Sequence, residues 1–181
     1  MSITKVFWLY GRSGAGKTTL ARQLHRALSD RKIPVFYLDG DDLRSGLCAD
    51  LAFTPEARLE NHRRLAEVAK LAANQGFNVV VSSMAPQHGH RDIVRQILGD
   101  QLTWIHIHAP LEVCIQRDPK GLYRRAQAGK LDQLINYPFD APRPDEKEHH
   151  IDTVEHDVAG AAQKILTVVQ TILPVDRQPS A

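Results

Sequence analysis

Residues 11–18 are the segment whose residue types and spacing point most directly to chemistry. They read GRSGAGKT and match the phosphate-binding pattern G-x-x-x-x-G-K-[ST] in full. Glycines let the backbone curl so that several N–H groups face phosphate oxygens, and a helix beginning near Lys17 adds the positive end of its dipole. The segment therefore predicts a cradle for the phosphates of ATP. A chance glycine turn is disfavoured, because a hydrophobic strand is predicted before the segment and an amphipathic helix after it.

Each part of this cradle has an expected task. Lys17 can bridge the β- and γ-phosphates as a catalytic residue, and the Thr18 hydroxyl can ligate Mg²⁺. The residues expected to contact the phosphates are Gly11, Ser13, Gly14, Ala15, Gly16, Lys17, Thr18 and Thr19. ATP as co-substrate and Mg²⁺ as cofactor are therefore predicted together.

Carboxylates follow the second predicted strand, in residues 37–44 (YLDGDDLR). Doubly wound sheets bind ligands at the carboxyl ends of their strands, so we expect this turn to face the cradle. Asp39 is the candidate for holding Mg²⁺, partly through water, and for orienting or deprotonating a hydroxyl nucleophile. Asp41 is a second catalytic candidate that could hold the acceptor, and Arg44 offers a fork for an anionic group. The alternative is a solvated acidic turn, which is common in loops.

The elements that must position these residues alternate between strand and helix. Strands are expected at residues 6–10, 33–38, 78–82, 102–108 and near 150–152. Helices are expected after the cradle, from Thr54 to Gly76, near 91–98, over 111–117 and over the final amphipathic stretch, whereas residues 118–145 look irregular, basic and proline-rich. This alternation predicts an α/β fold with a mostly parallel sheet of about five strands and helices on both faces.

Composition narrows the class of protein. The 181 residues, 43% of them hydrophobic and 24% charged, favour a single soluble domain, expected over residues 1–175 with a flexible tail at 176–181. No apolar run has the length of a membrane span, and the first ten residues do not resemble a signal peptide, so we predict a cytoplasmic protein without a membrane partner. The net charge of +2 does not predict binding to a nucleic acid polymer. Cys48 and Cys114 are expected to be reduced packing residues.

Four segments resemble the adenylylsulfate (APS) kinases, over about residues 3 to 153. They are residues 11–19 (GRSGAGKTT), 38–44 (LDGDDLR), 58–61 (RLEN) and 109–129 (APLEVCIQRDPKGLYRRAQAG). The resemblance implies a P-loop kinase fold with a basic lid at about 118–145. It also implies transfer of the γ-phosphoryl group of ATP to the 3′-hydroxyl of APS, giving 3′-phosphoadenylylsulfate (PAPS) in sulfate assimilation.

The resemblance also implies roles for residues outside the cradle. Arg117 would lie near the ATP base, and Lys120 near the phosphates and the acceptor. Three further positions match residues that contact APS, so the expected acceptor site consists of Asp41, Arg44, Phe53, Arg58, Asn61 and Lys120. A basic lid suits several negative charges, although each lid cation could equally belong to a solvated helix face.

Two segments depart from the family pattern. Where the family reads close to F-I-S-P-Y-R, this chain has Ala85 in place of a serine and His88 in place of a substrate-binding arginine. Where the family lid carries a phenylalanine that stacks on the APS adenine, this chain has Leu134 in a stretch about two residues shorter. Because these changes all fall on the acceptor side, the acceptor could differ from APS.

Three hypotheses follow. The first is a kinase for APS or an APS-like nucleotide. The second is a kinase for another small anionic metabolite, such as cytidine diphosphoramidate, and the third is a nucleotide-binding regulatory module without turnover. Intact Lys17, Thr18 and Asp39 disfavour the third. The expected partners are ATP and a small anionic, nucleotide-like acceptor, and a homodimer is one expected assembly.

Histidines carry a weaker signal. His106 and His108 alternate on one predicted strand, while His88, His90, His149 and His150 fall in predicted loops. A metal site would require three of them to converge, and packing or surface roles are the simpler interpretation.

Overall fold

A computed structural model describes residues 4–129 and 138–173. Its centre is one five-stranded sheet in the order β2-β3-β1-β4-β5, and every pair of neighbours is parallel. The strands are β1 (Val6–Tyr10), β2 (Val35–Asp39), β3 (Asn78–Ser83), β4 (Leu102–His108) and β5 (His150–Asp152). This architecture confirms the predicted α/β fold class and the expected five strands.

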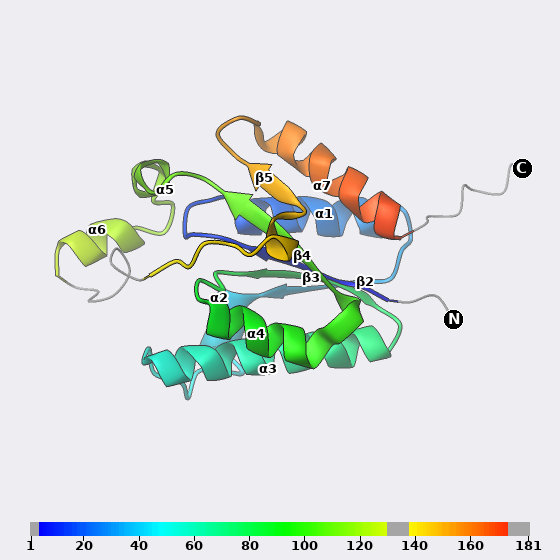
Figure 1. The fold of residues 1–181 in the computed structure, drawn as a ribbon, viewed down its shortest axis with the longest axis horizontal. Coiled ribbons are helices and arrows are strands. Elements are labelled where there is room, and N and C mark those ends of the chain that lie inside the picture. The colour runs from blue at the N-terminus through cyan, green and yellow to red at the C-terminus, as the bar shows by residue number, and fades with distance from the viewer. Residues whose placement is uncertain (1–3, 130–137, 174–181) are drawn as a thin grey trace, which may run out of the picture.

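Helices cover both faces of the sheet (Figure 1). The α-helices are α1 (Lys17–Asp30), α2 (Gly40–Ser45), α3 (Pro55–Asn74), α4 (His88–Leu98), α5 (Leu111–Arg117), α6 (Leu122–Gln127) and α7 (Val158–Ile172). Two 3₁₀ turns, η1 (Gly99–Gln101) and η2 (Asp145–Lys147), complete the described elements. None of the described helices combines the length and apolar character that crossing a membrane requires.

The central strand β1 explains why the sheet is covered on both sides. All five of its side chains are buried, and successive side chains of a strand point to opposite faces. Phe7 and Leu9 pack in the core with α1 and α7, whereas Trp8 and Tyr10 pack in the core with α3 and α4. Because the ends of β1, β3 and β4 are in register, the loops that leave these strands meet at one edge.

Several predicted boundaries differ from the structure. The second strand begins at Val35, after Pro34, and extends to Asp39. The predicted loop around His88 and His90 is the first turn of α4, where the Gln87 side chain and His90 form a reciprocal N-cap. The acidic turn is the short helix α2, which Asp39 caps by accepting a hydrogen bond from the backbone N–H of Asp41.

The region expected to be irregular contains α6. Gly121 precedes this helix in a left-handed conformation, and the Asp118 carboxylate accepts hydrogen bonds from the backbone N–H groups of Tyr123 and Arg124. The sequence prediction missed this helix because its cap lies four residues before its first residue, across Pro119 and Gly121. Part of the predicted lid, including Lys130 and Leu134, lies outside the described residues.

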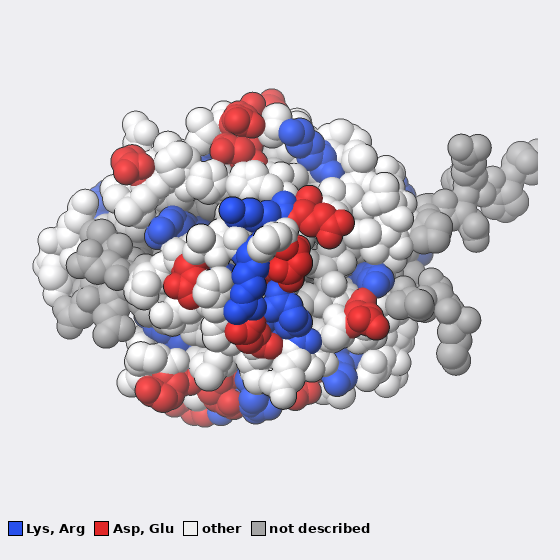
Figure 2. Space-filling model, in the orientation of Figure 1, with Lys and Arg blue, Asp and Glu red and all other residues white. Residues whose placement is uncertain are grey.

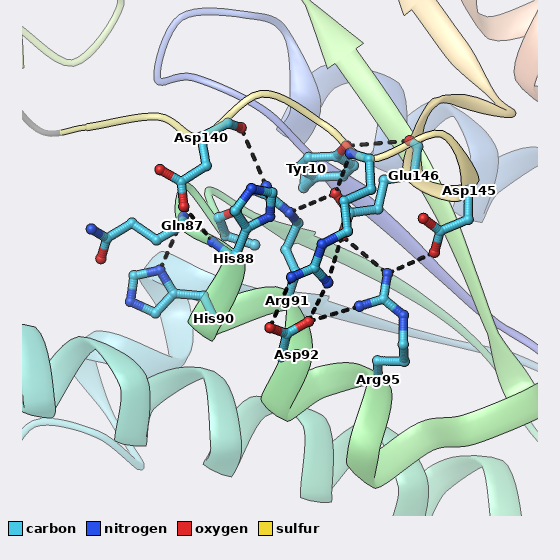
Figure 3. A network of polar contacts seen from close by, with 12 residues as sticks. Tyr10, Gln87, His88, His90, Arg91, Asp92, Arg95, Asp140, Asp145 and Glu146 are labelled. Atoms are coloured by element: carbon cyan, nitrogen blue, oxygen red, sulfur yellow. Dashed lines mark hydrogen bonds and ion pairs between the residues drawn. The ribbon is translucent and has the colours of Figure 1, made fainter.

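A polar network links α4 to the segment that precedes β5 (Figure 3). Arg91 and Glu146 are fully buried, and the Arg91 Nε donates to a Glu146 carboxylate oxygen at 2.9 Å. The remaining Arg91 donors reach the backbone oxygens of Ala85, Pro86 and Asp140 and the ring of His88. These contacts of Arg91 therefore fix the loop after β3 against residues 140–146. Basic and acidic side chains also lie side by side across the middle of this face of the molecule (Figure 2).

Candidate active site

The phosphate-binding loop lies between β1 and α1, and its glycines are required by close packing. A Cβ on Gly11 would lie 2.1 Å from the Ile107 backbone oxygen, and one on Gly14 would lie 2.8 Å from that of Cys114. Gly16 precedes α1 in a left-handed conformation, with φ of 100°. The loop is thus held against β4 and α5, with the start of α1 at its end.

Lys17 extends along this loop. Its Nζ donates to the Arg12 backbone oxygen at 2.7 Å. Burial lowers the pKa of Lys17 to about 8, and the positive charge of Lys120 acts in the same direction, whereas Asp41 opposes the shift. An anionic phosphate beside this ammonium would favour its charged form.

The carboxylate of Asp39 is buried at the carboxyl end of β2, and three donors surround it. Its Oδ2 accepts from the Tyr37 hydroxyl at 2.7 Å and from the Thr18 Oγ1 at 3.2 Å, while its Oδ1 accepts from the Asp41 N–H at 2.9 Å. The Ser82 hydroxyl lies 3.3 Å from the Thr18 Oγ1. These carboxylate and hydroxyl oxygen atoms from β2, β3 and α1 are the kind of metal ligand that Mg²⁺ prefers.

Tyr37 and Ser82 were not predicted from the sequence. Tyr37 could have been found, because it lies two residues before Asp39 on the same face of β2. Burial, followed by its hydrogen bond to Asp39, raises the Tyr37 pKa, so the hydroxyl remains a donor. Ser82 pairs with Asp39 across the neighbouring strand β3, and that pairing is visible only once the strand order is known.

Asp41 lies on the exposed side of α2 and forms an ion pair with Lys120. Lys120 comes from the connection between α5 and α6, so this contact brings two predicted site residues together across the mouth of the site. It also connects the start of the lid to the acidic helix.

Apart from Lys120, the predicted acceptor residues lie on α2, on α3 and in the turn between them. Phe53 is exposed, and the guanidinium groups of Arg44 and Arg58 lie 4.9 and 5.7 Å from its ring centre. The Asn61 Oδ1 is buried and has no hydrogen-bond partner among the described residues. Since buried polar atoms are nearly always paired, this oxygen marks a position where a ligand could donate.

One cavity of about 1610 Å³ joins these groups. Its walls include the cradle, Asp39 and the whole predicted acceptor set, together with Arg117 from the end of α5. Six of the eight residues of the loop predicted to contact the phosphates line the cavity, namely Ser13, Gly14, Gly16, Lys17, Thr18 and Thr19. Gly11 and Ala15 do not line it. The cavity can therefore hold a nucleoside triphosphate and a second substrate side by side.

Arg117 is fixed where the β5–α7 turn meets the loop. Its guanidinium donates to the Thr153 side-chain and backbone oxygens, both at 2.8 Å, and the Thr153 hydroxyl lies 3.1 Å from the Ala15 backbone oxygen. Thr153 was missed by the sequence analysis, and its position after the short strand β5 was the only available signal.

Two of the positions that depart from the family, Ala85 and His88, do not line this cavity, and Leu134 lies outside the described residues. Ala85 is fully buried, and its N–H donates to the His62 ring. The His88 ring contacts Arg91, and the His88 N–H donates to Asp140. His88 is therefore engaged in the network of Figure 3.

Five of the nine histidines gather in two places. His62 and His90 stack with ring centres 4.5 Å apart and line the cavity. His106, His108 and His150 lie together at the β4–β5 edge, and the His106 and His150 Nδ1 atoms are 3.0 Å apart. In the described part of the chain, no histidine, cysteine and carboxylate side chains group as a metal site would require.

Buried neutral histidines predict a loss of stability in acid. Burial is the main cause that lowers the pKa of His62 and His106 to about 3 and that of His90 to about 4, from an ordinary value of 6.5. Between about pH 6.5 and 4 the unfolded chain therefore binds more protons than the folded chain, so the free energy of unfolding should fall as the pH falls. The expected slope is up to about 1.4 kcal/mol per pH unit for each histidine.

Urea unfolding at about pH 7, 6 and 5 measures this slope. Replacing His106 with phenylalanine, which can stack on Tyr10 and Phe139, should make the dependence shallower. A free energy of unfolding that stays constant over this range in the wild-type protein would contradict the prediction.

Comparisons with known proteins agree with this geometry. The family model for adenylylsulphate kinase matches residues 3–152. An adenylyl-sulfate kinase from Paraburkholderia xenovorans is 49% identical over 139 residues, covering 76% of this chain and 78% of the relative. The structure of the Mycobacterium tuberculosis APS kinase in complex with AMPPNP and APS superposes with a TM-score of 0.88 at 34% identity, covering 94% of this chain and 99% of that chain.

A third relative bears on assembly. The structure of a hexameric APS kinase from Thiobacillus denitrificans superposes with a TM-score of 0.70 at 26% identity. It covers 94% of this chain and 29% of that chain.

Proposed function

The chain belongs to the adenylylsulphate kinase family, and on that premise we propose that it transfers the γ-phosphoryl group of ATP to the 3′-hydroxyl of APS, giving ADP and PAPS. The observation that carries this proposal is the single cavity that contains both the phosphate cradle and the predicted acceptor residues. Phosphoryl transfer depends mainly on positioning two substrates and on stabilising charge, and a shared cavity meets the first requirement.

On the donor side, the loop and the start of α1 bind the β- and γ-phosphates, and Lys17 neutralises their charge. Arg117, fixed by Thr153, lies on the side of the cavity that would hold the nucleoside. The 3′-hydroxyl oxygen forms a bond to the γ-phosphorus while the bond from that phosphorus to the β–γ bridging oxygen breaks. ADP leaves, and the proton of the hydroxyl passes to a carboxylate at the end of β2.

Thr18 and Asp39 fit a magnesium ion, because they present a hydroxyl and a carboxylate oxygen 3.2 Å apart beside the cradle. We propose that Thr18 holds the ion directly and Asp39 partly through water. When bound, Mg²⁺ would neutralise charge on the phosphates of ATP.

On the acceptor side, Phe53 offers a ring face to the base, and Arg44 and Arg58 offer charge to the anionic end. The unpaired Asn61 Oδ1 can accept a hydrogen bond from the same ligand. Asp41 and Lys120 face each other across the mouth and would contact substrate from opposite sides.

Replacing Asp39 with asparagine should lower kcat by about 10²-fold or more, with a smaller effect on ATP binding. Asparagine has one acceptor oxygen where Asp39 uses two, so the contacts to Tyr37, Thr18 and Asp41 cannot all be kept. Steady-state kinetics and calorimetric binding of ATP separate the two effects. An unchanged kcat would indicate that Asp41, and not Asp39, orients or deprotonates the acceptor hydroxyl.

The proposal is tested by incubating the protein with ATP, Mg²⁺ and APS and measuring PAPS directly. We expect stoichiometric formation of ADP and PAPS, with little ATP hydrolysis when APS is omitted. Cytidine diphosphoramidate serves as the alternative acceptor in a parallel reaction. Turnover of that nucleotide without turnover of APS would contradict the proposed acceptor, and ATP binding without turnover of either would favour a regulatory module.

We further propose that copies of the chain associate, the homodimer being the predicted form. The hexameric relative supports self-association without specifying the number of copies. Light scattering of the purified protein measures this number.

A further inference from the structure

His90 lies at the acceptor end of the cavity, although the sequence predicted no acceptor role for it. It belongs to the first turn of α4, is 2% exposed, and lines the cavity together with Arg58, Asn61 and His62. The residue two positions earlier, His88, replaces the family's substrate-binding arginine but faces Arg91 instead of the cavity. The role of that arginine is therefore open to another side chain.

Hydrogen bonding fixes the tautomer of the His90 ring. The backbone N–H of Gln87 donates to the His90 Nδ1 at 3.3 Å, so this nitrogen must carry a lone pair (Figure 3). A neutral imidazole with an acceptor at Nδ1 carries its proton on Nε2. Among the residues that the structure describes, the hydrogen bond at Nδ1 is the one that the His90 ring makes. His90 thus keeps one N–H donor available.

The neighbouring ring supports this arrangement instead of competing for the donor. The His62 Nε2 accepts from the Ala85 N–H at 3.2 Å, so its Nδ1 is protonated and donates to the Arg58 backbone oxygen at 2.8 Å. With both nitrogens used, His62 is a neutral surface on which the His90 ring stacks at 4.5 Å. The orientation of His90 is therefore set by its cap and by this stack.

The local charges favour an anion in front of this donor. Burial is the main reason that the His90 pKa falls to about 4, and the positive charges of Arg58 and Arg91 lower it further, opposed by Asp140. Arg58 also lines the cavity, whereas Arg91 is buried in the network behind. Arg58 is therefore the positive charge that an anion beside His90 would meet.

We propose that His90 determines acceptor specificity by donating its Nε2–H to the anionic end of the acceptor nucleotide, beside Arg58, as a substitute for the arginine absent from position 88. The inference rests on the proposed function, because it assigns one contact in the same site. A neutral N–H donor held by a helix cap differs from an arginine, because it fixes the direction of one hydrogen bond without adding a positive charge.

Two amide substitutions separate this role from a structural one. His90→Asn places an oxygen near the position of the Nδ1, so it can keep the helix cap, but it removes the distal donor. His90→Gln places an amide near the position of the Nε2, so it can keep the distal donor, but it loses the cap. The two variants therefore remove the two functions of the ring one at a time.

The experiment measures the APS KM, the ATP KM and calorimetric binding of APS in the presence of Mg²⁺ and ADP. We expect His90→Asn to raise the APS KM about 10-fold with the ATP KM and the melting temperature nearly unchanged. We expect His90→Gln to keep the APS KM within about 3-fold of the wild-type value, even if the melting temperature of this variant falls. Because the change in the APS KM is compared with the change in the ATP KM of the same preparation, the test does not depend on the amount of folded enzyme.

The possible outcomes are distinct. A wild-type APS KM in His90→Asn, or an APS KM that follows the melting temperature through both variants, would overturn the role of His90 while leaving the proposed function in place. Failure of the wild-type protein to turn over or bind APS would overturn the proposed function and the assignment of His90 with it.

Discussion

Replacing Lys17 with alanine should abolish phosphoryl transfer, lowering kcat by about 10³-fold or more while the fold is retained. The ammonium is the cation that the loop itself supplies to the β- and γ-phosphates, and only the Arg12 backbone oxygen receives a hydrogen bond from it in the described structure. Stability should change little, because the side chain has no carboxylate within ion-pair distance among the described residues, and burial already disfavours its charge.

Single-turnover measurements of PAPS formation test this expectation, together with a thermal unfolding curve. The matched control is Lys164→Ala, which removes an exposed lysine of α7 that does not line the cavity. The control should retain wild-type turnover. If Lys17→Ala retained turnover within a few-fold of the wild-type value, the loop would not be the catalytic cradle.

The largest expected effect on stability comes from Glu146. Replacing it with glutamine leaves the fully buried Arg91 guanidinium without its carboxylate, and breaking a buried pair in this way costs about 3–5 kcal/mol. For a chain of this length such a loss lowers the melting temperature by roughly 6–20 °C. Glutamine conserves the volume of the side chain, so the loss reports on charge and hydrogen bonding instead of on a cavity.

Thermal and urea unfolding of Glu146→Gln measure the effect, with Glu148→Gln as control. Glu148 is exposed in the same segment, and its substitution should be nearly neutral. Because Arg91 also holds the backbone oxygens of Ala85 and Pro86, the Glu146 variant should weaken acceptor binding more than ATP binding. Equal stability of the two variants would show that the other Arg91 contacts compensate for the lost carboxylate.

The sequence predicted the elements and the place of the glycine loop between β1 and α1 well, for a physical reason. The glycine pattern of residues 11–18 and the carboxylate after the second strand are local features, and each constrains the backbone within a few residues. The position of Thr54 and Pro55 likewise identified the start of α3, where the Thr54 hydroxyl accepts from the Ala57 N–H. The fold class followed from the same alternation of periodic segments.

The acceptor side was less predictable because its contacts join distant parts of the chain. The same holds at the proposed magnesium position, where Tyr37, Ser82 and Thr18 meet around Asp39 only through the strand order. The engagement of His88 with Arg91 involves Asp140, which follows His88 by about fifty positions and contacts both residues. A substitution at position 88 read from sequence alone thus suggests a lost contact, whereas the structure offers a neighbouring donor.

The close packing of Gly11 and Gly14 has a consequence for synthesis on the ribosome. All residues of the phosphate-binding loop are made early, but the wall against which the loop closes comes from Ile107 and Cys114, nearly one hundred residues later. A nascent chain that ends within β3 therefore contains the complete motif without a surface to shape it. Nucleotide binding should first appear on translation intermediates in which β4 and α5 have left the exit tunnel, and ATP could then retain those intermediates in a native-like form.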